Sequence, residues 1–345
     1  MKKAIACYAP FTLALCFTSV TAASAAETTN QLEAGLATFS LDTLEPAPTE
    51  VERSGGRGES GERSRPQAGP PSERPAGGPP AMPPGMPPGG PVFDETWVSV
   101  GLGAGLVPSY AGSDDYILFP LPLIVGRVGG VGISPNGPGF VLDVLSPEPG
   151  FGPRKTRISA GPAFRIRNDR VAQIEDEVVE TLEDLDLAVE VGANVGVAIP
   201  GVFGPRDTLV LSTQVRWDVA GAHEGMLIEP TVGYRTNFGR GIAFQAAANL
   251  QFVDDDYARY YFSVTPDQSV TSGLPQFDAE GGLNSVGVLA VTNFDLDGNL
   301  LNGGLNIYTV LGYSRLVNDA ADTPFTDIRG DANQFIGGLG IGYTF

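Results

Sequence analysis

The feature that most constrains this chain is a two-residue alternation that continues to its last residue. Within 336–345, Leu339, Ile341, Tyr343 and Phe345 share one parity, while glycines and a threonine hold most of the other. This pattern predicts a strand with one apolar face and one small or polar face. A soluble sandwich strand can alternate in the same way. A strand that closes a barrel in lipid, however, requires an apolar outer face and leaves no free edge, so the segment favours a membrane barrel.

The same alternation recurs along residues 93–345. Segments of about 10 residues with this repeat, separated by turn residues, are typical of transmembrane barrels. Charged and amide side chains recur on the inward parity, which a polar lumen accepts and a sandwich core does not. The predicted fold class is therefore all-β, a transmembrane antiparallel β-barrel of about twelve strands preceded by a disordered Pro/Gly-rich segment. The expected strands are 96–107, 116–126, 130–145, 156–167, 186–199, 207–219, 225–236, 240–253, 258–265, 283–294, 300–315 and 333–345.

This strand count also predicts which connections share an end of the barrel. An even count returns both barrel termini to the periplasmic side. Residues 168–185, which look helical and acidic, then lie on the periplasmic side, and so does the turn that holds His223. Aromatic residues near strand ends are expected to form an interfacial girdle: Trp97, Trp217, Tyr234, Phe252, Tyr313 and Tyr343.

Two segments precede the predicted barrel, which spans 93–345. Residues 1–26 are typical of a secretory signal, with Lys2 and Lys3 before an apolar stretch and small residues at 23–25. A lipoprotein reading at Cys16 is less favoured, because bulky Leu15 precedes it. Residues 27–92 predict a disordered Pro/Gly-rich periplasmic arm. The arm is interpreted either as a variable linker or as a partner-binding tether. Beyond the signal there is no run of 18 or more apolar residues.

Charge and residue types restrict the function classes. The formal net charge of -19 argues against nucleic acid, and against docking to anionic lipid through basic patches. Both cysteines, Cys7 and Cys16, lie in the predicted signal, which leaves no thiol for a disulfide or a metal site. The sequence has no phosphate-binding loop or dinucleotide fingerprint, so no cofactor is predicted.

Catalytic and metal-binding candidates are weak. The single histidine, His223, is expected in a solvated turn beside Glu224 and not as the base of a nucleophile. The acidic runs 254–256 and 295–299 are typical of tight turns and allow at most weak surface cation binding. The sequence therefore predicts a protein that is not an enzyme, with no catalytic, cofactor-binding or metal-binding residues.

Three stretches together resemble the MipA/OmpV family of outer-membrane proteins, known for a scaffold that interacts with the hydrolase MltA. They are GLGAGLVPSYAGSDDYILFPLPLI at 101–124, YYFSVTPDQSVTSGLPQFDAEGGL at 260–283, and the final 33 residues from 313. The residues that carry the resemblance are Tyr110, Gly112, Ser113, Pro120, Pro122, Ser272, Gly273, Leu274, Pro275, Asp319, Ala320, Ala321, Asp322 and Pro324. The Pro-rich segment departs from the family's usual short amino terminus.

The resemblance implies a twelve-stranded barrel in the outer membrane of a Gram-negative cell. It implies a scaffold between a murein hydrolase and a murein synthase, or an adhesin. A small-solute, porin-like channel stays open as an alternative. The last strand resembles the signal read by the barrel-assembly machinery, carried by Leu339, Ile341, Tyr343 and Phe345. Expected partners are that machinery, outer-membrane lipid and lipopolysaccharide, and murein enzymes, with no nucleic acid. On the inward parity of this strand, Gly340→Ser is expected to be mild.

Overall fold

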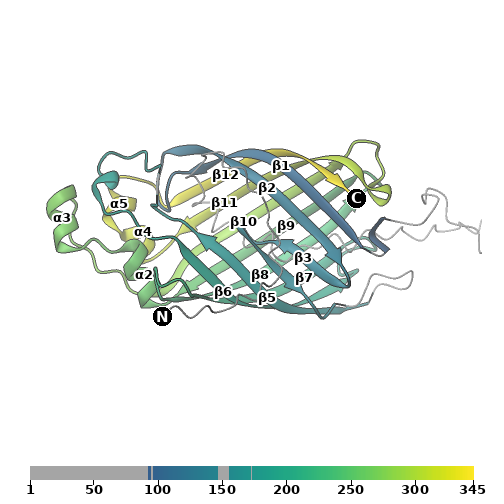
Figure 1. The fold of residues 1–345 in the computed structure, drawn as a ribbon, viewed down its shortest axis with the longest axis horizontal. Helices are drawn as coiled ribbons and strands as arrows, with labels where there is room; N and C mark the ends of the chain where they lie inside the picture. The colour runs from purple at the N-terminus through teal and green to yellow at the C-terminus, as the bar shows by residue number, and fades with distance from the viewer. Residues whose placement is uncertain (1–91, 95, 147–154, 172) are drawn as a thin grey trace, which may run out of the picture.

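Twelve antiparallel strands close into a single barrel, as the alternation predicts (Figure 1). The computed structural model describes residues 92–94, 96–146, 155–171 and 173–345. Each strand pairs with its neighbours along the chain, and β1 pairs with β12 to close the wall. The strands are β1 (Trp97–Pro108), β2 (Tyr116–Val128), β3 (Val131–Pro135), β4 (Gly139–Asp143), β5 (Arg157–Arg167), β6 (Ala188–Pro200), β7 (Thr208–Asp218), β8 (Met226–Phe238), β9 (Ile242–Val253), β10 (Gly282–Asp295), β11 (Gly304–Leu316) and β12 (Asn333–Thr344).

The two ends of the barrel differ. One end, which we call the turn end, holds the start of β1, the end of β12 and the connections after β2, β6, β8 and β10. The other, the loop end, holds the connections after β1, β5, β7, β9 and β11 (Figure 1). Its helices are η3 (Val179–Thr181), α2 (Asp255–Phe262), α3 (Pro266–Ser272), α4 (Asp319–Asp322) and α5 (Pro324–Asp327). None of the helices within the described ranges is long and apolar enough to cross a membrane.

Residues that alternate between apolar and small or polar types in the sequence alternate between the outer wall and the lumen in the structure. On β12, Leu339, Ile341 and Tyr343 point outward and are exposed, whereas Gln334 and Ile336 point inward and are buried. The same holds for β1, where Leu102 and Leu106 are exposed and Ser99 is buried. A two-residue repeat fixes the facing of every side chain once one of them is fixed. The predicted outer face of the terminal strand is therefore confirmed.

One side of the lumen is packed with apolar side chains. Val107, Ile117, Leu289 and Tyr308 form part of a buried cluster between β1, β2, β10, β11 and β12. Glycines leave room for them, because a Cβ on Gly340 would collide with the Tyr308 ring. The structure therefore argues against the expectation that Gly340→Ser is mild, because a side chain at this position would have to displace the Tyr308 ring.

A short segment before β1 packs into the turn end. In η2 (Val92–Asp94), Phe93 meets Trp97 edge to face at 4.8 Å, and both are buried together with Leu300. Trp97 is 1% exposed and points into the lumen, so its predicted place in an interfacial girdle is wrong. Trp217 and Tyr343 do lie on the outer surface, with 47% and 45% of their area exposed.

Two predicted strands are wrong, and their effects on the count cancel. The expected strand 130–145 is two short strands, because Asn136, Gly137 with φ of 63°, and Pro138 form a turn between β3 and β4. The expected strand 258–265 is mostly helix α2, which begins where the Asp254 side chain accepts the Tyr257 amide. The number of strands stays at twelve, but every strand between the two errors runs opposite to the expected direction.

The segment 168–185 therefore lies at the loop end, so the expectation that it shares an end with the barrel termini is wrong. It is also not one helix. Its regular part within the described residues is the single turn η3, which follows a turn in which Asp176 accepts the amides of Val178 and Val179. The predicted signal at 1–26 and the arm up to residue 91 lie outside the described residues.

Candidate functional site

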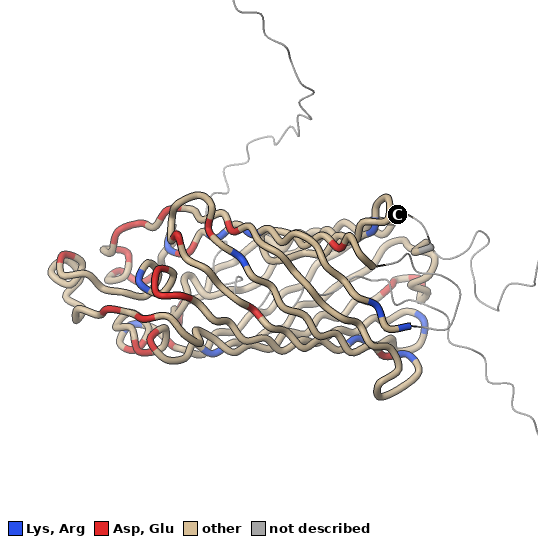
Figure 2. The backbone as a smooth tube through the Cα atoms, turned by 90° about the horizontal axis from the view of Figure 1, so that it is seen from below, with Lys and Arg blue, Asp and Glu red and all other residues tan. Residues whose placement is uncertain are grey.

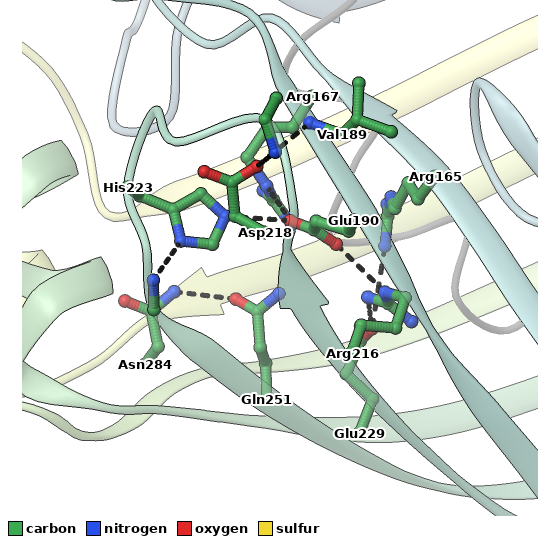
Figure 3. A network of polar contacts seen from close by, with 12 residues as sticks. Arg165, Arg167, Val189, Glu190, Arg216, Asp218, His223, Glu229, Gln251 and Asn284 are labelled. Atoms are coloured by element: carbon green, nitrogen blue, oxygen red, sulfur yellow. Dashed lines mark hydrogen bonds and ion pairs between the residues drawn. The ribbon is translucent and has the colours of Figure 1, made fainter.

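A group of buried charged side chains forms a network inside the barrel near the loop end (Figure 3). The inward parity of four consecutive strands supplies it: Arg165 and Arg167 on β5, Glu190 on β6, Arg216 on β7 and Glu229 on β8. The side chains of all five are no more than 1% exposed. Sequence patterning finds these charges on the inward face but cannot show which of them pair.

The pairs form a chain across the strands. Arg167 Nε donates to Glu190 Oε1 at 2.7 Å, and Arg216 Nε donates to Glu190 Oε2 at 2.9 Å. A terminal nitrogen of Arg216 also donates to Glu229, and Arg165 Nη1 lies 3.6 Å from the same carboxylate. Arg216 additionally donates to Gln214 at 2.6 Å. Arg216 therefore links the two glutamates into one network.

Burying these charges is costly unless each one keeps its counter-charge and its hydrogen bonds. The network holds three guanidinium groups against two carboxylates, so removing either glutamate would leave three cations against one carboxylate. Amides extend the polar surface toward β9 and β10, where Asn284 Nδ2 donates to Gln251 Oε1 at 2.8 Å. The arrangement is suited to holding the neighbouring strands β5 to β8 together on the inner side of the wall.

His223 belongs to this network, and the expectation of a solvated turn histidine is wrong. It is 3% exposed and lies at the loop end. The expected end was wrong because the predicted strand 130–145 is two strands, which reverses the direction of β7. Its Nδ1 accepts the Gly225 amide at 3.1 Å, and its Nε2 faces Glu190 Oε1 at 3.6 Å. The ring packs edge-on against Tyr257 at 5.0 Å. Both nitrogens are thus directed at protein groups.

An apolar cap, formed by the loops and by α2, α4 and α5, covers the network. Its buried members include Tyr110, Val179, Leu182, Tyr257, Tyr261, Phe262, Val264, Leu274, Ala320 and Phe325. Cation–π contacts join cap and network, with the Arg167 guanidinium 5.1 Å from the Tyr257 ring centre. Arg170 lies 4.8 Å from the Phe325 ring centre and donates to the Tyr261 carbonyl at 3.1 Å.

Hydrogen bonds tie the loops of the cap to one another. Arg329 Nη2 forms an ion pair with Asp176 Oδ2 at 2.6 Å, which links the connection after β11 to the one after β5. The Thr323 hydroxyl donates to the Phe262 carbonyl at 2.7 Å. Outside this packed layer the loop end carries many acidic side chains, as Figure 2 shows, and Arg259, Arg315 and Arg329 are among its exposed basic side chains.

The structure brings many of the family-resemblance residues into the cap. Tyr110 is fully buried with its ring 6.2 Å from Phe325, and Ala320 and Pro324 are buried beside it. Gly112 has φ of 101° and faces Thr326 so closely that a Cβ would collide with it. Around these residues, Asp319 Oδ2 accepts the Glu280 amide at 2.7 Å, and the hydroxyls of Ser113 and Ser109 are 2.9 Å apart.

The remaining family-resemblance residues lie elsewhere. Ser272 and Gly273 end helix α3, whereas Leu274 folds back into the cap. Pro120 and Pro122 lie in the wall, on the outward parity of β2. The four residues of the predicted assembly signal all point outward and are 45–65% exposed.

The two acidic runs behave as turn residues. Asp254 caps α2, and Asp295 Oδ1 accepts the Asn299 amide at 2.8 Å. Among the described residues there is no group of three or more acidic, His or Cys side chains that could hold a metal ion.

These features define a class: an outer-membrane-type β-barrel with an apolar outer wall, a packed cap, and a lumen that holds an apolar cluster and a buried charge network. The model of the family described as MltA-interacting protein MipA matches residues 100–345, so the chain belongs to that family. A comparison with curated proteins finds no match.

Solved structures of outer-membrane proteins show only distant likeness. OmpT of Vibrio cholerae is 8% identical with a TM-score of 0.32, covering 73% of this chain and 97% of that one. The CymD monoaromatic hydrocarbon channel is 9% identical with a TM-score of 0.33, covering 74% and 90%. The channel DcaP of Acinetobacter baumannii is 9% identical with a TM-score of 0.28, covering 73% and 96%. Likeness at this level says nothing about what this chain carries.

Proposed function

We propose that this protein is a non-conducting, non-enzymatic barrel of the outer membrane that acts as a scaffold for enzymes of murein turnover. The observation that carries the proposal is the packing inside the described part of the barrel, where an apolar cluster and a buried charge network occupy the lumen. A diffusion channel is lined by polar side chains that face water. Here the inward charges of β5 to β8 are buried in ion pairs, and the cap lies over them.

The orientation supports a periplasmic role for the turn end. Outer-membrane barrels have short periplasmic turns and longer extracellular loops. The loop end, with its helices, then faces outward, where its acidic surface meets lipopolysaccharide through divalent ions. The turn end, with exposed Arg206 and Arg240, faces the murein layer. The family's description as MltA-interacting makes a murein hydrolase the first partner to test, with a murein synthase as the second.

Conductance in planar bilayers tests the closed lumen. We expect no discrete current steps from the purified full-length protein under conditions in which a general porin gives them. Steps that scale with protein concentration would replace the scaffold by the small-solute channel.

Binding assays test the scaffold. The protein in nanodiscs is titrated with a purified murein hydrolase of the MltA type. Arg206→Glu combined with Arg240→Glu is expected to weaken binding, whereas Arg259→Glu at the loop end leaves it unchanged. Equal loss in both variants would show that the turn end is not the docking surface, and no binding by the wild type would refute the partnership. Adhesion then becomes the function to test, with loop-end variants.

A further inference from the structure

The wall of the barrel is interrupted on one side of β2. This strand pairs with β1 from Tyr116 to Arg127, but with β3 only over Gly126–Val128. Within the part of the chain that the structure describes, residues 116–125 therefore have no strand partner on the β3 side. We call this stretch the ladder gap.

The gap is bounded on its other sides. The turn at residues 136–138 between β3 and β4 lies opposite it, and β4 pairs onward to β5 from Gly139↔Arg165. Toward the loop end, the Ala111 amide donates to Asp169 Oδ1 at 3.2 Å, which joins the connection before β2 to the one after β5. The gap is thus a closed interruption in the loop-end half of the wall.

A further strand is a poor occupant of the gap. Pro120 and Pro122 have no N–H to donate, and proline on an edge strand is a common obstacle to added strands. The Leu121 carbonyl already accepts the Tyr308 hydroxyl from inside the barrel at 2.6 Å. The residues of the gap therefore do not present a regular ladder to another chain.

Both faces of the gap are apolar. On the outside, Leu118 and Ile124 are 70% and 56% exposed. On the inside, Phe119 and Leu123 are only partly buried, and they pack against the apolar cluster that contains Leu289 and Tyr308. The far border of the gap is β5, which carries Arg165 and Arg167 of the charge network, and their side chains are buried in ion pairs. A molecule that enters along β2 therefore meets apolar side chains on that strand.

We propose that the ladder gap admits an acyl chain of a membrane lipid from the loop-end leaflet into the apolar half of the lumen. The chain of the lipid would cover the side chains of Phe119 and Leu123, which the protein itself leaves only partly buried. The proposal requires that the barrel spans a membrane and is independent of the scaffold role.

Site-directed fluorescence tests the proposal in the full chain with Cys7→Ser and Cys16→Ser. Bimane is attached to Phe119→Cys or Leu123→Cys inside the gap. Leu289→Cys is the inward control on β10, which is paired on both sides. Leu118→Cys is the outward reference. In vesicles containing tail-brominated phosphatidylcholine, the gap probes are expected to be quenched several-fold more than Leu289→Cys, and nearly as strongly as Leu118→Cys.

Two outcomes overturn the proposal. Quenching of both gap probes no greater than that of Leu289→Cys means that acyl chains do not enter. Quenching by aqueous iodide without quenching by brominated lipid means that the gap is a water-filled side opening. Folding of each variant is checked by heat-modifiable mobility. If the variants fail to fold, wild-type protein is photo-crosslinked with palmitic acid that bears a terminal diazirine. Crosslinks are expected at residues 117–123, including those that point inward. Crosslinks confined to outward-pointing residues would refute the entry of the acyl chain.

Discussion

Replacing Glu190 by glutamine removes the carboxylate shared by two buried arginines. Its two oxygens lie 2.7 Å from Arg167 Nε and 2.9 Å from Arg216 Nε, and all three side chains are buried. Glu229 would then be the remaining carboxylate of the network for three guanidinium groups. Breaking a buried pair in this way costs about 3–5 kcal/mol. At about 1.4 kcal/mol per factor of ten, the folding equilibrium falls roughly a hundred- to several-thousand-fold.

Urea titration of protein in lipid vesicles, followed by tryptophan fluorescence, measures this loss. Glu180→Gln, on an exposed loop-end side chain, is the matched control and is expected to lie near zero. Adding Arg167→Met to Glu190→Gln is expected to recover part of the loss, because Arg167 loses its ion pair with Glu190 in the single variant. Arg216, by contrast, keeps Glu229. A Glu190→Gln variant as stable as Glu180→Gln, or a double variant with strictly additive losses, would refute the reasoning that the network is electrostatically coupled.

Four further predictions follow from the wall, the cap and the chain's amino-terminal part. Ile341→Asp and Gly340→Ser are both expected to reduce the amount of heat-modifiable barrel in purified outer membranes. For Ile341→Asp the cause is a charge in lipid, which costs up to about 2 kcal/mol of folding free energy. Tyr308→Ala should rescue only Gly340→Ser, and rescue of both variants or of neither would contradict the assigned facing of these side chains. Partial burial of Asp176 opposes its ionisation, but hydrogen bonds from Arg329 and two amides lower its pKa below the usual 3.8. The stability that the Asp176 carboxylate contributes is therefore present above pH 3.8 and is lost as the pH falls through the lowered pKa. Hydrogen exchange at Val178 and Val179 should accelerate in that acidic range, and already at neutral pH in Arg329→Gln. His223→Ala should change no turnover of phospholipid, lipid A, peptide or murein, and an activity that vanishes in this variant would contradict a structural role. Limited proteolysis in detergent should remove residues 27–91 and leave the barrel intact, unless that segment is as resistant as the strands.

The alternation within each strand predicts which side chains face outward from the wall, but it does not predict which side chains pair inside the lumen. The facing of Leu339 and Ile341 depends on a two-residue repeat within one strand, which the sequence displays directly. The ion pairs depend on register between strands, such as Arg165 opposite Glu190 and Gln214 opposite Glu229, which no single strand contains. Helix α2 was predictable in part, since Tyr257 and Tyr261 are four residues apart and face the cap, but its aromatic composition favours strand.

The strand count is a weaker test of a barrel than the direction of each strand. Splitting 130–145 at Gly137 adds a strand, and the helix at α2 removes one, so twelve is reached either way. What the errors change is which connections share an end. With the directions corrected, the connections after β1, β5, β9 and β11 meet at the loop end, which is the condition for the cap to form.

The contact between these connections at the loop end explains in physical terms what several of the family-resemblance residues do. Tyr110, Leu274, Ala320 and Pro324 come from three connections far apart in sequence, and all are buried in the cap or packed beside it. Arg170 and Arg167 make cation–π contacts with aromatic rings of the cap. Cap and network therefore stabilise one another, because the cap covers the ion pairs and the arginines bind its rings. Because cap and network are buried against one another, their residues are not available to a partner, and the loop surface, the turn surface and the outer wall are the surfaces left for binding.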